Sequence, residues 1–320
     1  MNASPPVRWG FIGAGFVASR AMAPAVLEAP NAMLQVVAAR DPARAIALHP
    51  VRVVHSYDDV CDASDVDAVY ISLANDDHLP WVLRAISAGK HVLCEKPLGL
   101  SGSEVEKMMT AANDAGVLVV EAAWNRWHPR TRYVEALLAK VDEARDVHTW
   151  FTFDGVASDN YRLDPSRGGG ALLDVGCYCI AAAHWATASD ELTVVEAKVV
   201  RGDSGVDLTT AATLLTETGT ARIKASIAET PSQGLLITTP SVQLEFLDAP
   251  FTSWREPSGL RLVKNGVEVV EMFPRCNAYT LMVEAVSSRV AGEDAWVLPL
   301  SASLATAHTL DAVRSEAALS

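Results

Sequence analysis

The chain has 320 residues, of which 50% are hydrophobic and 20% are charged, and its formal net charge is −13. This length suits two domains with large buried cores. The acidic balance argues against nucleic acid or an anionic membrane surface as a partner, and no apolar run reaches membrane length. Residues 1–8 contain no apolar signal-peptide segment, so we expect a cytoplasmic protein.

The five cysteines are odd in number and lie mostly within apolar runs, which indicates reduced, buried thiols. Cys177 and Cys179 form a C-x-C pair. Because neither a second pair nor a histidine cluster completes a zinc ligand set, we expect no metal site.

A glycine-rich turn stands near the N-terminus. Residues 7–12 predict a short buried strand, and the sequence GAGFVA at 13–18 follows directly, before a helical segment at 17–28 that Pro24 should kink or restart. In G-x-G-x-x-A the glycines allow a tight turn and a close backbone approach to a pyrophosphate, and the small residue lies where helix meets strand. The motif predicts a dinucleotide site that includes Gly13, Gly15, Phe16 and Val17.

The end of the next strand, at residues 34–39, bears on the choice of dinucleotide. An acidic residue usually follows this strand in NAD sites, but here Arg40 follows, with Arg44 one turn on. Guanidinium groups bind phosphate strongly, so the pattern favours NADP over NAD. Asp41 leaves NAD open as an alternative, because it either binds the ribose or, before Pro42, starts a helix.

The alternation of strands and helices continues to about residue 122, which predicts a doubly wound parallel sheet. Apolar segments at 49–54, 67–73, 91–94 and 117–122 are expected strands. Ligands bind at the carboxyl ends of such strands, where we expect Gly13, Arg40, Asn75 and Lys96.

The strand at 91–94 ends in Glu95-Lys96-Pro97. Charged residues seldom end a buried strand without a task, and an X-Pro bond is the peptide bond that most readily becomes cis. A cis bond here would direct Lys96 sideways. The alternative is an ordinary solvated strand end.

The second half has a different period. Its strand-like segments alternate polar and apolar residues and are joined by turns such as Asn265-Gly266, which predicts a large, mostly antiparallel open sheet. We therefore expect an α/β nucleotide-binding domain at 1–123 and an α+β domain at 124–320 for substrate binding and oligomerisation, with the last helix packing back on the first domain.

Three glycines at 168–170 precede a helix that carries Asp174 and Tyr178. These two residues are four apart and so share one helix face. They form either an acid/base pair that faces the cofactor or a buried tyrosine bonded to a carboxylate, and the sequence leaves both interpretations open.

Taken together, the motifs resemble the glucose–fructose oxidoreductase / inositol dehydrogenase / rhizopine-catabolism (Gfo/Idh/MocA) family. Residues 13–18, 73–78, 95–97 and 168–176 match its motifs in order, although Ala74 replaces a usual proline. Tyr178 stands where the inositol-type branch has histidine. This resembles the branch of dimeric dihydrodiol dehydrogenase and NADP-linked D-xylose dehydrogenase.

The resemblance implies hydride transfer between nicotinamide C4 and a carbinol or carbonyl carbon of a sugar, polyol or diol. Tyr178 would be the acid/base, Lys96 would lower its pKa, and Asp174 would orient Lys96 or a hydroxyl. Further cofactor-binding residues would be Leu73, Asn75, His78 and Glu95, and substrate-binding residues would be Trp124, Arg126, Tyr161 and Arg162.

The sequence leaves two other functions open. One is 3-ketoreduction of a nucleotide-linked deoxysugar, and the other, which is not enzymatic, is that of an NADP(H)-binding redox sensor. We also expect a homodimer or homotetramer formed through the C-terminal sheet.

Overall fold

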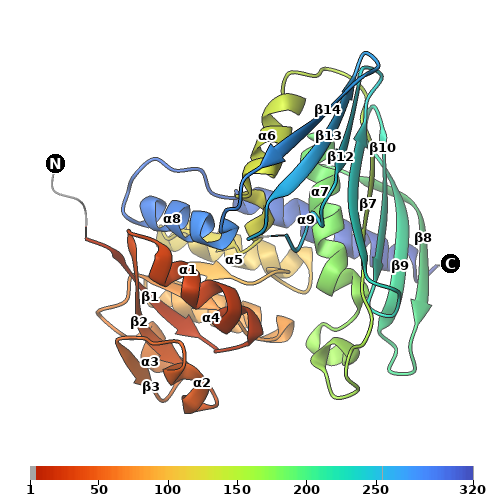
Figure 1. Cartoon of the computed structure of the whole chain (residues 1–320). Helices are drawn as coiled ribbons and strands as arrows, with labels where there is room; N and C mark the ends of the chain where they lie inside the picture. The colour runs from red at the N-terminus through yellow and green to blue at the C-terminus, as the bar shows by residue number, and fades with distance from the viewer. Residues whose placement is uncertain (1–4, 254, 320) are drawn as a thin grey trace. The chain divides into compact units, whose positions relative to one another are not determined.

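The computed structural model describes residues 5–253 and 255–319. The chain divides into two compact units, each with its own sheet (Figure 1). Unit 1 comprises Met1–Gly99, Ser103–Trp127 and Asn277–Leu300, and unit 2 comprises Leu100–Gly102, His128–Cys276 and Ser301–Ser320.

The sheet of unit 1 has six strands in the order β3-β2-β1-β4-β5-β6, and every pairing is parallel. The strand order reverses between β1 and β4, which is the switch point where doubly wound sheets bind nucleotides. This confirms the predicted Rossmann fold. The strands are β1 (Val7–Ile12), β2 (Ala32–Ala38), β3 (Arg52–Val54), β4 (Ala68–Ile71), β5 (His91–Cys94) and β6 (Val119–Glu121).

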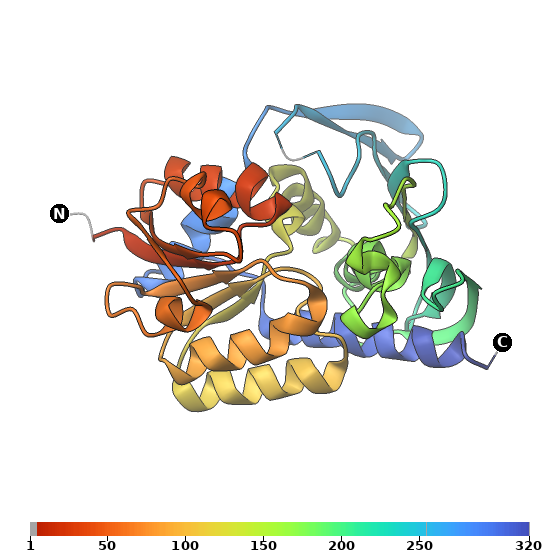
Figure 2. The ribbon, with the colours of Figure 1, turned by 90° about the horizontal axis from the view of Figure 1, so that it is seen from below.

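Helices cover both faces of this sheet (Figure 2). The crossover that follows β1 begins as a π-helical turn and continues as α1, with Pro24 in the first turn of α1. The restart predicted at this proline is therefore present, because proline lacks the N–H that a helix interior needs. The helical segments are η1 (Ala18–Met22), α1 (Ala23–Glu28), α2 (Pro42–Ile46), α3 (Tyr57–Cys61), η2 (Asn75–Asp77), α4 (His78–Ser87), α5 (Gly102–Ala115), η3 (Trp124–Arg126) and α8 (Ala278–Val290).

Helix α8, rather than the final helix, groups with unit 1. The indole N–H of Trp9 donates to Ser287 Oγ at 3.1 Å, and the Asn31 amide donates to the Glu284 carbonyl at 2.9 Å. The final helix, α9 (Leu300–Glu316), belongs almost entirely to unit 2. The chain thus returns to unit 1 after the second sheet, which a single division at residue 123 does not provide for.

The sheet of unit 2 has eight strands in the order β14-β13-β12-β11-β7-β10-β9-β8. Within the described strands of this second sheet, only the pairing of β10 with β7 is parallel, so the predicted mostly antiparallel sheet is confirmed. The strands are β7 (Asp146–Thr152), β8 (Thr193–Arg201), β9 (Asp207–Leu215), β10 (Thr220–Ser226), β11 (Ser232–Thr238), β12 (Val242–Phe246), β13 (Ser258–Lys264) and β14 (Val267–Phe273). The helical segments include α6 (Pro129–Leu138), η4 (Tyr161–Leu163), η5 (Pro165–Arg167), η6 (Leu172–Gly176) and α7 (Cys177–Thr187).

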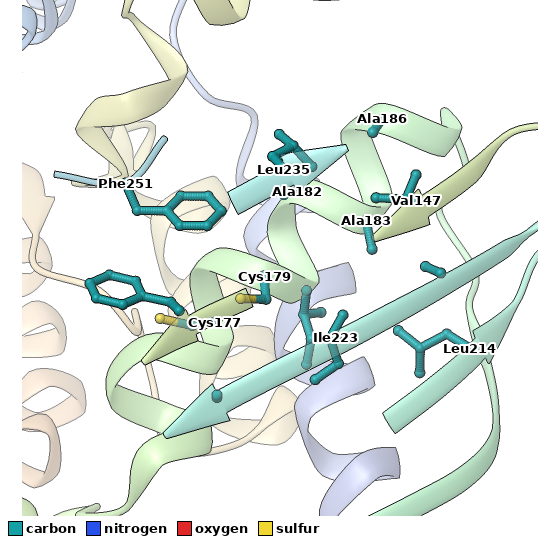
Figure 3. Close-up of a cluster of buried hydrophobic side chains, with 14 of the residues drawn as sticks. Val147, Cys177, Cys179, Ala182, Ala183, Ala186, Leu214, Ile223, Leu235 and Phe251 are labelled. Atoms are coloured by element: carbon teal, nitrogen blue, oxygen red, sulfur yellow. The ribbon is translucent and has the colours of Figure 1, made fainter. Parts of the chain in front are cut away.

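The core of unit 2 lies between α7 and the middle of this sheet (Figure 3). Ala182, Ala183 and Ala186 are fully buried, and such small side chains let the helix lie close to β7 and β10. Cys177 and Cys179 belong to the same apolar cluster, and burial raises the pKa of the Cys179 thiol to about 12. All five cysteines, which lie in the described part, are outside disulfides, and four of the five are buried.

Along β7, Val147, Thr149 and Phe151 are buried against this core, whereas His148 points to the opposite face and is exposed. This alternation is the pattern that predicted the sheet. In residues 5–253 and 255–319, none of the helices is both long and apolar enough to cross a bilayer.

Candidate active site

The glycine turn after β1 has a geometry that other residues would not tolerate. Gly13 has a φ of 96°, and a Cβ at this position would overlap the carbonyl oxygen of Ser72 at the end of β4. A Cβ on Gly15 would lie 3.4 Å from the Ser72 hydroxyl oxygen. Phe16 is 71% exposed and Val17 is half-buried, just before the π-helical turn. Glycine thus lets the turn pack tightly against the end of β4, as the dinucleotide-binding motif requires, and such a turn fits the pyrophosphate of a dinucleotide.

At the end of β2, the carboxylate of Asp41 already has a structural partner. Its Oδ1 accepts the N–H of Ala43 at 2.9 Å, so Asp41 is the N-cap of α2. Arg40 and Arg44 are exposed. The Arg40 charge also acts on Tyr57, where it lowers the tyrosine pKa although burial raises that pKa overall. This strand end thus presents cations and a carboxylate that is engaged in a helix cap.

The loop after β4 turns its polar residues inward. Leu73 is half-buried, Asn75 is 4% exposed, and His78 is completely buried. The Nδ1–H of His78 donates to the Pro97 carbonyl at 2.9 Å, and burial lowers the pKa of His78, so the ring is neutral. His78, which was expected to bind cofactor, is bonded to the turn that follows Lys96.

The Glu-Lys-Pro turn after β5 is bonded to its neighbours on several sides. The Lys96–Pro97 bond is cis, as expected from the sequence. The hydroxyl of Tyr70, on β4, donates to Glu95 Oε1 at 2.7 Å, and the N–H of Leu98 donates to Glu121 Oε1 at 3.1 Å. Burial raises the pKa of Glu95, although the Tyr70 hydrogen bond and the Lys96 charge act against this rise. Glu95, which was expected to bind the cofactor, therefore has an internal partner.

Two residues expected at the substrate are packed side chains in η3. Trp124 is 3% exposed and stacks on Tyr279 of α8, with ring centroids 5.2 Å apart. Arg126 is 8% exposed, and its guanidinium lies over the Trp296 ring at 5.8 Å. Any contact of these residues with a substrate stays a prediction.

In unit 2, two of the three glycines, Gly169 and Gly170, pack against backbone and a carboxylate. A Cβ on Gly169 would lie 2.5 Å from the Arg162 carbonyl oxygen, and a Cβ on Gly170, which has a φ of 107°, would overlap Asp207 Oδ1. Asp207 Oδ2 accepts the N–H of Leu172 at 2.7 Å, at the start of η6. The glycines thus let a carboxylate from β9 hold the beginning of the helix that leads to Tyr178.

Asp174 forms an ion pair with Arg162. The guanidinium Nε donates to Asp174 Oδ2 at 2.6 Å, and the side chain of Asp174 is 6% exposed. Burial lowers the pKa of Arg162, but the charge and hydrogen bond of Asp174 raise it and prevail. The guanidinium also lies over the Tyr161 ring at 5.0 Å. Arg162, which was expected at the substrate, is a fixed partner of Asp174.

Tyr178 lies in the first turn of α7, among aromatic rings. Its ring centroid is 5.6 Å from that of Phe251 and 5.9 Å from that of Phe151. Tyr178 is half-buried, whereas these two phenylalanines are 2% and 8% exposed. The ring of Tyr178 therefore packs among aromatic side chains, and the charge of Arg162 also interacts with this tyrosine.

Several residues that shape these sites were not found from the sequence. Tyr70 was part of an apolar strand, Glu121 ended another strand, and Asp207 opened a third. Their sequence neighbours carry no motif, because each acts on a residue far along the chain. In residues 5–253 and 255–319, no cluster of three or more His, Cys, Asp or Glu side chains is placed to hold a metal ion.

Comparison with known proteins places both units. Residues 7–123 match the model of the oxidoreductase family with an NAD-binding Rossmann fold (GFO_IDH_MocA), and residues 137–243 match the GFO/IDH/MocA C-terminal domain. D-xylose 1-dehydrogenase (NADP(+)) 2 of Haloferax volcanii is 31% identical over 318 residues, 97% of each chain. Trans-1,2-dihydrobenzene-1,2-diol dehydrogenase of Mus musculus is 33% identical over 182 residues, 54% of each chain.

A solved structure is similar over nearly the whole chain. It is a 3-ketoreductase from Actinomadura kijaniata in complex with NADP and TDP-benzene, with 27% identity and a TM-score of 0.90. The match covers 97% of this chain and 98% of that chain.

Proposed function

Since the chain belongs to the Gfo/Idh/MocA family and is an NAD(P)-dependent oxidoreductase, we propose that it acts on a carbinol or carbonyl carbon of a sugar, polyol or dihydrodiol. The observation that carries the proposal is the presence of two residues suited to this chemistry, the strand-end lysine Lys96 and the half-buried tyrosine Tyr178. Each lies in a motif of the family, one in each unit.

We propose NADP as the preferred cofactor, with NAD as the alternative. Support comes from the exposed Arg40 at the end of β2 and from Asp41, whose carboxylate caps α2. A guanidinium binds a 2′-phosphate through charge-assisted hydrogen bonds that a ribose hydroxyl cannot form. The 3-ketoreductase was solved with NADP, and the D-xylose dehydrogenase is named for NADP(+).

In the proposed reaction Tyr178 carries the proton. When bound, the nicotinamide supplies or accepts the hydride. During reduction the Tyr178 hydroxyl donates its proton to the substrate oxygen, and during oxidation the phenolate takes that proton back. A tyrosine with a pKa near 10 is a poor base at neutral pH, so we assign Lys96 to stabilise the phenolate. In an apolar environment like that of Phe151 and Phe251, a nearby positive charge acts more strongly than it would in water.

The other proposed roles follow the environment of each residue. Asp174 and Arg162 form a charge-balanced pair, which we propose orients a substrate hydroxyl with Tyr161 beside it. Glu95 and His78 act on the turn that carries Lys96. The remaining proposed contacts are Gly13, Gly15, Phe16, Val17, Leu73 and Asn75 with the cofactor, and Trp124 and Arg126 with the substrate.

A substrate screen tests this proposal. Purified protein would be assayed with NADP⁺ and NADPH, and with NAD⁺ and NADH in parallel, over pentoses, inositols, dihydrodiols and keto-sugars. We expect turnover of at least one sugar, polyol or diol, with NADP preferred. Tight NADPH binding without turnover of any substrate would instead support a redox sensor and contradict the proposal.

A second candidate activity is 3-ketoreduction of a nucleotide-linked deoxysugar. The TM-score of 0.90 to the 3-ketoreductase favours it. Product analysis separates the two candidates, since a free pentose would be inactive and a nucleotide-linked 3-keto sugar active if the second is correct.

We also propose that the chain forms a homodimer or homotetramer through the sheet of unit 2. This is supported by apolar side chains that are exposed on its strands, including Val200, Val267 and Met272 at 61–64%. Light scattering is the test, and a monomer at the working concentration would contradict the proposal.

A further inference from the structure

A completely buried tyrosine touches the Glu-Lys-Pro turn. Tyr70 lies on β4, next to β5 in the parallel sheet, and the N–H of Glu95 donates to the Ile71 carbonyl at 3.0 Å. The Tyr70 ring is 0% exposed and packs against Phe11, with centroids 4.7 Å apart. Its hydroxyl is fixed by this packing and donates to Glu95 Oε1 at 2.7 Å. The sheet therefore aims one phenol at one carboxylate.

The two groups have complementary protonation states. Burial and the adjacent Glu95 charge raise the pKa of Tyr70 well above its ordinary value, so the phenol keeps its proton and donates at all working pH values. Burial raises the pKa of Glu95, which disfavours its charge, while the bond from Tyr70 favours that charge. Loss of the Tyr70 hydroxyl would thus leave a half-buried carboxylate with less support for its ionised form.

Glu95 is covalently adjacent to the proposed catalytic lysine. The positive charge of Lys96 lowers the pKa of Glu95, so the two side-chain charges attract each other. We propose that Tyr70 is a positioning residue, which holds Glu95 as an oriented carboxylate so that Lys96 stays charged and fixed at the end of β5. This inference rests on the proposed function of Lys96.

Other titratable groups near Glu95 and Tyr70 also affect the pKa values of these two residues. Glu121 of β6 raises the pKa of Glu95. The Glu95 charge in turn raises the pKa of Cys94 on β5. Tyr279 of α8 raises the pKa of Tyr70, and the Ser72 hydroxyl bonds with Tyr70 and lowers this pKa. These groups remain in a Tyr70→Phe variant, so a change in the titration of Glu95 reports the loss of one hydroxyl.

The first test is a titration that needs no substrate. Carboxyl ¹³C NMR of glutamate-labelled protein would follow Glu95 with pH, and the signal would be assigned by its absence in Glu95→Gln. We expect the Glu95 pKa to be higher in Tyr70→Phe than in the wild type. A Tyr133→Phe variant, which removes an exposed hydroxyl in unit 2, should leave the titration unchanged. Equal Glu95 pKa values in wild type and Tyr70→Phe would overturn the inference.

The second test follows turnover with pH. In Tyr70→Phe, kcat/KM should fall about tenfold at the acidic end of the profile and much less at the alkaline end, because the lost bond matters only while Glu95 takes up a proton. A purely structural defect would lower kcat/KM by the same factor at every pH. A uniform fall would overturn the inference.

A third variant keeps the inference testable if Tyr70→Phe does not fold. Glu95→Gln retains the shape of the side chain and removes its charge, so it should lose the acidic limb of the profile together with most activity. Wild-type activity and an unchanged profile in Glu95→Gln would contradict the role of Tyr70. If the titration shifts as expected but Lys96→Ala keeps full turnover, the proposed function fails and the Tyr70–Glu95 coupling stands.

Discussion

The two units hold their proposed reactive residues in opposite ways. In unit 1, directed hydrogen bonds reach the turn around Lys96, from Tyr70 to Glu95, from His78 to the Pro97 carbonyl and from the Leu98 N–H to Glu121. In unit 2, Tyr178 lies among phenylalanine rings at centroid distances of 5.6 and 5.9 Å. Hydrogen bonds specify direction, whereas aromatic packing lowers the local dielectric constant. Unit 1 is thus suited to fix the position of the Lys96 charge. Unit 2 is suited to make the pKa of Tyr178 sensitive to a nearby charge.

The largest effect expected from this comparison follows removal of the Lys96 ammonium. In Lys96→Ala the Tyr178 phenolate loses its proposed stabilising cation, so kcat at neutral pH should fall by about 10²- to 10³-fold. The loss should shrink as pH rises, because the unassisted tyrosine then ionises more readily. Steady-state rates over a pH series measure this.

The matched control is Lys140→Ala, which removes an exposed lysine. It should keep wild-type rates. If Lys96→Ala has the same kcat and pH profile as Lys140→Ala, Lys96 does not stabilise the phenolate, and the Glu-Lys-Pro turn has another role.

Unit 2 contains a buried histidine that should destabilise the fold when it takes up a proton. Burial and the Arg130 charge lower the pKa of His128 to about 4, and its Nδ1 accepts the N–H of Arg130 at the start of α6. Because this pKa lies below the ordinary 6.5, the stability linked to neutral His128 is complete above pH 6.5 and is lost as pH falls toward 4. The loss amounts to about 3 kcal/mol.

A His128→Asn variant should keep the helix cap and lose this dependence on pH. Denaturant unfolding at several pH values between about 4 and 7 would show a flatter free energy of unfolding than in the wild type. His49→Asn replaces an exposed histidine and is the control. The assignment is wrong if His128→Asn and the control have the same slope.

A smaller effect is expected at the end of β2. This strand end is exposed, unlike the turn after β5, which buried hydrogen bonds hold in place. Arg40→Ala should lower the preference for NADP over NAD by about tenfold or more, since a charge-assisted bond to the 2′-phosphate is lost. Dissociation constants for NADPH and NADH, measured by fluorescence titration, give the ratio.

Asp41→Asn distinguishes the two roles of that carboxylate. Asparagine caps a helix as well as aspartate does, so NADH affinity should not change if Asp41 only caps α2. Weaker NADH binding in Asp41→Asn, or an unchanged cofactor ratio in Arg40→Ala, would overturn the assignment of NADP.

The sequence predicted those features that depend on local backbone requirements. The positive φ of Gly13 needs glycine, Pro24 restarts a helix, and the Lys96–Pro97 bond is cis. Each of these features can be recognised from the residue types within a few positions. The parallel and antiparallel sheets were predicted from hydrophobic periodicity in the same way.

Contacts between distant residues were not predictable in this way. Asp207 holds the N–H of Leu172, 35 positions earlier, and α8 returns to unit 1 after the whole second sheet. The Arg162–Asp174 pair was missed because Arg162 was assigned to the substrate and Asp174 to Lys96 or a substrate hydroxyl. Their mutual distance depends on how the glycine loop folds back. Tyr70 looked like a core residue because one buried hydroxyl does not alter an apolar strand pattern.

The central claim is that Tyr178 carries the proton of the reaction, and its most direct test is the turnover of Tyr178→Phe. This substitution keeps the ring packed against Phe151 and Phe251 and removes only the hydroxyl. With a substrate found in the screen, kcat should fall by about 10²- to 10⁴-fold while the dissociation constant for NADPH stays within about threefold of wild type. A kcat close to that of the wild type, with NADPH binding intact, would contradict the account.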